Sequence, residues 1–91
     1  MKRKVIYLPG ALKDLKRVGK NNADRILAKI VEMARQENEP GKPLRNLPDD
    51  LKGLRSYRIG DYRVIFRLTE EEIKVYIIAH RSDVYKKLKF S

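Results

Sequence analysis

The segment SYRIGDYRVIFRL, residues Ser56–Leu68, decides the fold because it holds two runs of strand-forming residues around a Gly-Asp pair. A two-residue loop with glycine first is typical of a type II′ turn between antiparallel strands. That register places Arg58 directly opposite Arg63, and like charges in opposed positions destabilise a sheet. The segment therefore predicts a hairpin whose two arginines need an external anion. The other predicted pairs are Ile59 with Tyr62, Tyr57 with Val64, and Ser56 with Ile65.

A third strand-like run, Ile73–Ala79, follows a turn at Thr69–Glu72 and predicts a second hairpin. Side chains alternate between the two faces of a sheet. The predicted pairs are Leu68 with Ile73, Phe66 with Val75, Val64 with Ile77, and Tyr62 with Ala79. The predicted core face, to be covered by helices, holds Tyr57, Ile59, Tyr62, Val64, Phe66, Val75, Ile77 and Ala79. The opposite face is predicted to hold Ser56, Arg58, Arg63, Ile65, Arg67, Lys74, Tyr76, Ile78 and His80.

This opposite face is rich in basic side chains that alternate with a tyrosine and isoleucines. Such a surface is typical of a site that binds phosphates and stacks a base on a ring. The alternative is that the long basic side chains extend into water or pair with Glu70–Glu72. We favour the anion site because Arg67 opposite Lys74 repeats the like-charge pairing of Arg58 with Arg63.

The first half of the chain predicts a short strand at Lys4–Leu8 and then two helices. The first helix begins at Pro9, which a first turn tolerates, and Gly19 is a plausible stop. Its apolar positions are Ala11, Leu12, Leu15 and Val18. Asn21 or Asn22 is a suitable N-cap for the second helix. The apolar positions of that helix are Ile26, Leu27, Ile30, Met33 and Ala34.

The stretch Asn38–Asp50 contains three of the four prolines and predicts a surface loop, and a helical tail is predicted at about Ser82–Leu88. The 91 residues are enough for one domain, residues 1–91. The predicted class is α+β. An N-terminal strand and a helical hairpin pack on one face of a mainly antiparallel, about four-stranded sheet, and a short helical tail follows.

The composition predicts a partner of opposite charge. Lysine and arginine number 22 against 12 acids, a net charge of +10, which favours nucleic acid or another polyanion over a mere solubility effect. The absence of cysteine and the single histidine argue against a zinc site, and we expect no metal or other cofactor. No apolar run reaches the roughly 20 residues that a membrane helix needs, so we expect no membrane partner. The cysteine-free composition suits a reducing cytosol and nothing suggests export, so we expect a cytoplasmic protein.

The stretch AHRSDVYKK, Ala79–Lys87, brings together three groups that can move a proton or stabilise a phosphate. These are His80, Arg81 and Tyr85. A helix starting near Ser82 would bring Arg81 close to Tyr85. The ordinary alternatives are a hydrogen-bonded histidine and a tyrosine packed on the sheet edge.

The motifs LKGLRSYRIGDYRVIFRL and VYIIAHRSDVYKK, with the helical opening and the connection KPLRNLPDDLKGL, resemble the RelE branch of the RelE/ParE toxin superfamily. The resemblance covers nearly the whole chain. It implies a toxin of a type II toxin–antitoxin system that enters the A site of a 70S-type ribosome and cleaves mRNA there. In this chemistry the 2′-hydroxyl attacks the adjacent phosphate without a metal. The resemblance also implies an acidic, RelB-like antitoxin in a toxin–antitoxin hetero-oligomer.

The resemblance assigns roles to matching positions. It implies that Arg63 binds the phosphate, that Arg81 stabilises charge or acts as the acid, and that Tyr85 stacks on or orients the nucleotide. The family's basic lysine pair before the hairpin is displaced here, so the general base stays open between Lys52 and His80. The residues we expect to contact RNA are Arg55, Arg58, Arg67, Lys74 and Tyr76.

Two other functions fit the same fold. A ParE-like chain would bind DNA gyrase and cut nothing, and an inactive relic would only bind RNA. The motif HRSDVY favours the nuclease over the gyrase inhibitor, because ParE-type chains usually lack this cluster. Because the family's lysine is displaced in this sequence, the inactive relic remains an alternative.

Overall fold

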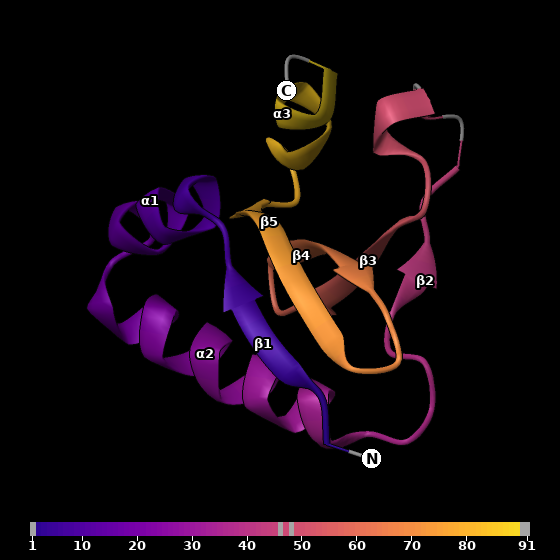
Figure 1. Ribbon diagram of the computed structural model, residues 1–91. Helices are drawn as coiled ribbons and strands as arrows, with labels where there is room; N and C mark the ends of the chain where they lie inside the picture. The colour runs from indigo at the N-terminus through magenta and orange to yellow at the C-terminus, as the bar shows by residue number, and fades with distance from the viewer. Residues whose placement is uncertain (1, 46, 48, 90–91) are drawn as a thin grey trace.

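The computed structural model describes residues 2–45, 47 and 49–89 and confirms the predicted α+β class (Figure 1). The elements are β1 (Lys4–Tyr7), α1 (Pro9–Arg17), α2 (Lys20–Arg35), β2 (Lys42–Pro43), a short 3₁₀ helix (Asp49–Leu51), β3 (Leu54–Ile59), β4 (Tyr62–Leu68), β5 (Glu72–His80) and α3 (Val84–Lys89). Among the described residues, no helix is long and apolar enough to cross a membrane.

The sheet has five strands in the order β1-β5-β4-β3-β2, where about four were expected. β1 pairs with β5 in parallel, and the remaining pairs are antiparallel. The additional strand is β2, which lies inside the stretch predicted as a loop and pairs with Arg55 and Ser56 of β3. Two residues are too few to show a strand period, so the sequence carried no signal for it.

The first predicted hairpin is correct residue by residue. Arg58 lies opposite Arg63, and the pairs on either side have the predicted register. Gly60 in the connecting turn has a φ of +59°, a conformation that glycine adopts without strain.

The second hairpin departs from the prediction at one residue. Phe66 pairs with Val75, but Ile65 pairs with Ile77, so Tyr76 is an extra residue in β5, a β-bulge. Beyond the bulge every side chain of β5 lies on the other face from the one predicted. Ile77 and Ala79, expected in the core under the helices, pack in a second cluster on the opposite face. Ile78, expected on the basic face, packs in the main core, and His80 lies opposite Tyr62.

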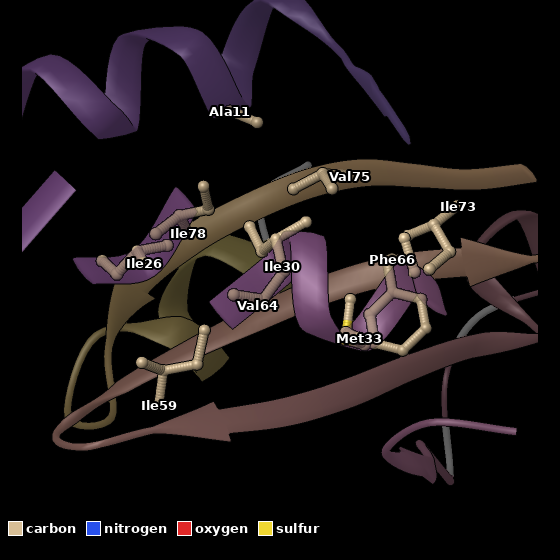
Figure 2. Close-up of a cluster of buried hydrophobic side chains, with 11 residues drawn as sticks. Ala11, Ile26, Ile30, Met33, Ile59, Val64, Phe66, Ile73, Val75 and Ile78 are labelled. Atoms are coloured by element: carbon tan, nitrogen blue, oxygen red, sulfur yellow. The ribbon is translucent and has the colours of Figure 1, made fainter. Parts of the chain in front are cut away.

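The main core lies between the sheet and the two N-terminal helices, where side chains of α2 lie among those of β4 and β5 (Figure 2). Its buried residues are Ala11, Ile26, Ile30, Met33, Ala34, Ile59, Val64, Phe66, Ile73, Val75 and Ile78. Leu12 is 48% exposed, so only part of the predicted apolar stripe of α1 is buried.

The predicted asparagine cap of α2 is wrong, because Gly19 holds the N-cap position without a side-chain cap bond. The Asn22 amide instead donates to the Val18 carbonyl at 2.9 Å and to the Tyr62 hydroxyl at 3.4 Å.

The opposite face of the sheet is partly covered as well. α3 and the segment before β3 bury an apolar group there, which we call the second cluster: Leu54, Ile65, Ile77, Ala79, Val84 and Leu88, with Leu44, Leu47, Leu51 and Tyr76 packed against it. α3 begins at Val84, two residues later than predicted.

One buried carboxylate links three elements. Asp14 of α1 is only 6% exposed, and its Oδ2 accepts the backbone N–H of Ile78 at 3.0 Å. Its Oδ1 pairs with the ammonium of Lys87 on α3. The paired part of β1 ends beside Val75. Asp14 therefore supplies an acceptor to β5 beyond the reach of β1 and ties α3 to α1.

Candidate anion-binding site

The opposed arginines at the β3–β4 turn form the centre of the site. Arg63 is half-buried and donates from Nη1 to the Ser56 hydroxyl at 3.2 Å. Arg58 is exposed and donates from Nε to the Gly60 carbonyl at 3.1 Å. In the described part of the chain, neither guanidinium forms an ion pair with a carboxylate. The two positive charges therefore stay uncompensated and favour an anion from outside.

An open depression lies beside these arginines. Its lining comes from β2, β3 and β4: Gly41, Lys42, Ser56, Tyr57, Arg58 and Arg63. Among the described residues, this lining contains three cations and no acid. Lys42 belongs to this group although the sequence did not single it out, because its position depends on the unforeseen strand β2.

Arg81 follows β5 and lies next to the same turn in the backbone. Its N–H donates to the Asp61 carbonyl at 2.7 Å. Its side chain is exposed, and Tyr85 on α3 is 59% exposed. Because α3 starts only at Val84, the two residues do not belong to one helix, and the predicted helical spacing between them is wrong.

His80 does not join the arginines. Beyond the bulge it lies on the helix-covered side, where its ring meets Tyr62 edge-on at 5.8 Å. Its Nδ1 accepts the N–H of Ser82 at 3.2 Å and lies 2.9 Å from the Ser82 hydroxyl. Nδ1 is therefore occupied within its own turn, as the acceptor of the Ser82 N–H. Together with Asp14 and Arg17, His80 lines a different depression.

Lys52 lies just before β3, at the end of the strand away from the β3–β4 turn, and so it is also apart from the two arginines. Its ammonium pairs with Asp49 at 2.8 Å, and its carbonyl accepts from Arg67 Nη1 at 3.1 Å. From Leu54 to Ile59 the strand rises about 16 Å, at about 3.3 Å per residue. Neither candidate base therefore lies beside Arg63.

The predicted basic face is divided in two. Arg67 and Lys74 are opposite each other at the far end, and the Arg67 guanidinium lies 6.0 Å from the centre of the Tyr76 ring. The second cluster separates this pair from Arg58 and Arg63. Continuous RNA contact along the face, as predicted, is therefore interrupted by α3 and the segment before β3.

Arg55 has a different position from the other predicted RNA contacts. It lies opposite Phe66, and its guanidinium donates to the carbonyls of Pro40 at 2.9 Å and Gly41 at 3.0 Å. Its fork of donors is thus used to hold the backbone that leads into β2.

No group of three or more metal-ligating side chains forms among the described residues.

Comparison with known proteins identifies the class. Residues 5–85 match the family model of the ParE toxin of type II toxin–antitoxin systems, parDE. The chain belongs to this family, and it is a toxin of a type II toxin–antitoxin system within the RelE/ParE superfamily.

Two toxins of Mycobacterium tuberculosis are similar to this chain. Toxin RelG is 40% identical over 70 residues, 69% of this chain and 77% of the relative. Toxin RelE is 39% identical over 83 residues, 84% of this chain and 78% of the relative. In the crystal structure of the RelBE2 toxin–antitoxin complex from the same organism, one chain is 31% identical with a TM-score of 0.65. That match covers 89% of this chain and all of the other (100%).

Proposed function

We propose that this toxin is a ribosome-dependent endoribonuclease that cleaves mRNA in the A site and so inhibits translation. The observation that carries the proposal is the opposed pair Arg58 and Arg63, which no carboxylate of the described residues pairs with and which lies adjacent in the backbone to Arg81. Identities near 40% to toxins named RelE and RelG support it further.

The proposed reaction is a transfer within the RNA. The 2′-oxygen attacks the adjacent phosphorus, the bond from phosphorus to the 5′-oxygen breaks, and a 2′,3′-cyclic phosphate forms. The 2′-hydroxyl proton leaves to a base, and the departing 5′-oxygen takes up a proton. Arg63 binds the non-bridging oxygens, Arg81 stabilises the growing negative charge, and Tyr85 holds the nucleotide in line.

The same proposal assigns the partners. An acidic, RelB-like antitoxin binds the toxin in a cytoplasmic hetero-oligomer, and the ribosome presents the mRNA. The relative described as a RelBE2 toxin–antitoxin complex supports the antitoxin. The charge of +10 favours both an acidic protein and RNA.

A second function is supported by the family match itself, whose description names the ParE toxin. In that case the protein binds DNA gyrase and leaves mRNA intact. The separation of Lys52 and His80 from Arg63 supports a third function, RNA binding without cleavage.

In vitro translation with mapping of mRNA ends, together with a gyrase supercoiling assay, separates the three functions. We expect cuts at the A-site codon. Blocked supercoiling with intact mRNA would establish the gyrase inhibitor, and neither effect would establish the relic.

Arg81→Ala is the informative variant in that assay. Loss of one charge-stabilising donor lowers the rate of the chemical step by about 100-fold or more. Ribosome binding should change little, because many basic residues remain. Equal losses of binding and cleavage would make Arg81 a docking residue. Tyr85→Phe should slow cleavage less than Tyr85→Ala if the ring stacks on the nucleotide.

A further inference from the structure

The position of Lys42 links it to the phosphate-binding arginines. β2 pairs with β3 so that Lys42 lies opposite Ser56, and the Ser56 hydroxyl accepts from Arg63. Residues opposite each other in neighbouring strands present their side chains on the same face. Lys42, Arg58 and Arg63 accordingly line one depression.

The ammonium of Lys42 is available to a ligand. Lys42 is exposed, and among residues 2–45, 47 and 49–89 it makes no side-chain hydrogen bond or ion pair. Lys20, Lys29 and Lys52, in contrast, each pair with a nearby carboxylate.

The backbone around Lys42 is held firmly for so short a strand. Arg55 donates to the carbonyls of Pro40 and Gly41, and the Leu44 N–H donates to the Leu54 carbonyl at 2.9 Å. Gly41 has a φ of +71°, and a Cβ there would lie 2.5 Å from the Ser56 carbonyl oxygen. Only glycine fits this close approach, which sets Lys42 beside Ser56.

From this geometry we infer that Lys42 is a third phosphate-contacting cation of the site and binds the RNA backbone together with Arg58 and Arg63. The inference deepens the proposed function and rests on it for the identity of the ligand as RNA. The role is one of charge: Lys42 neutralises a phosphodiester oxygen, and no bond is made or broken at its nitrogen. Arg55 is then a positioning residue that acts through β2.

Binding of a single-stranded RNA oligonucleotide to the isolated toxin tests the inference without requiring cleavage. Each phosphate contact on a single strand contributes about 0.7 to the slope of log affinity against log salt. Lys42→Ala should weaken binding and lower that slope by about 0.7. Lys42→Arg should restore both. Lys20→Ala removes a lysine from α2 and is the matched control.

Single-turnover mRNA cleavage on ribosomes provides the second arm. Lys42→Ala should slow it by at least about tenfold, with rescue by Lys42→Arg, because the role is charge and a guanidinium supplies it. Failure of arginine to rescue would overturn the charge role.

Two outcomes of the binding arm would overturn the inference. These are unchanged RNA binding by Lys42→Ala, and equal losses of RNA binding for Lys42→Ala and Lys20→Ala. If unchanged RNA binding comes with weaker binding of a polyglutamate peptide, the lysine is assigned to an acidic protein partner. If the wild type cuts no mRNA, the proposed nuclease function fails, but the oligonucleotide arm still decides whether Lys42 contacts RNA.

Discussion

At the scale of single residues, Arg58 and Arg63 face each other in a strand pair where a neutral pair would be more stable. Both guanidinium groups bond to neutral oxygens of their own chain, Arg58 to the Gly60 carbonyl and Arg63 to the Ser56 hydroxyl. Such bonds orient the groups without cancelling their charge. The sheet thus keeps a repulsion between the two guanidinium groups, which an anion bound between them would relieve.

Replacement of Arg63 tests whether the repulsion serves function. Arg63→Ala removes a like-charge contact and one hydrogen bond, terms that offset each other, so the free energy of unfolding should change by no more than about 1 kcal/mol. Cleavage of mRNA should be abolished. Urea unfolding and single-turnover cleavage measure the two effects, with Arg35→Ala on α2 as a control for loss of charge. A variant that unfolds would show that Arg63 is structural.

Tyr7 gives a prediction for alkaline pH. Burial raises the pKa of the Tyr7 hydroxyl above its ordinary value of 10.0. Above about pH 10 the unfolded chain therefore loses the proton while the folded chain retains it, and stability falls as pH rises towards the folded pKa. Below that range the residue contributes no pH dependence. Tyr7→Phe should flatten the decline.

The measurement is the free energy of unfolding of both proteins from about pH 9 to about pH 11. The titration of lysines is common to both chains and cancels in the difference. Parallel curves would show that the hydroxyl ionises as freely in the folded state as in the unfolded one.

At the scale of elements, prediction from sequence succeeded where local pattern and turn chemistry agree. The Gly-Asp turn fixed the β3–β4 register and therefore the Arg58–Arg63 pair. The bulge at Tyr76 was not predictable in the same way. Tyr76, Ile77, Ile78 and Ala79 are all apolar, and the sheet is covered on both faces here, so a slip by one residue leaves the hydrophobic pattern equally satisfied.

The candidate site was predictable at the two arginines of that hairpin and at Arg81, which the stretch after β5 singled out. Lys42 was missed because β2 is defined by its partner strand and has no period of its own. Arg55 was predicted to contact RNA from its place before the hairpin, and only the three-dimensional contacts reveal that its donors hold Pro40 and Gly41. For the cover of the second face a signal did exist, since Val84 and Leu88 are four residues apart in the helical tail.

The link between α1, β5 and α3 yields a prediction at this scale. Asp14→Ala leaves the Ile78 N–H in a buried place without its acceptor, which costs about 1–3 kcal/mol. Asp14→Asn keeps an oxygen for that N–H and loses only the charge that faces Lys87, so it should cost less. Chemical unfolding measures the difference, and hydrogen exchange at Ile78 locates it. Equal costs would mean that the ion pair, and not the N–H acceptor, dominates.

At the scale of the whole molecule, the net charge of +10 governs encounters before any contact forms. If the antitoxin is acidic, as proposed, attraction would raise the association rate, and salt would screen that attraction over a Debye length of about 10 Å at 0.1 M. Stopped-flow mixing with the cognate antitoxin should show an association rate that falls as ionic strength rises from about 50 mM to about 500 mM. A rate that is independent of salt would exclude electrostatic steering.

The order of strands in the sheet has a consequence for synthesis. β1 is made first, yet its neighbour in the sheet is β5, the strand made last. On a translating ribosome β1 therefore cannot pair with its neighbour at first, because the chain between β1 and β5 closes into a loop only when β5 has emerged. The N–H of Arg81, which meets the turn carrying the two arginines, follows β5 in turn. A chain whose synthesis has not yet passed β5 consequently lacks both the pairing of β1 with β5 and the contact of Arg81 with the turn between β3 and β4.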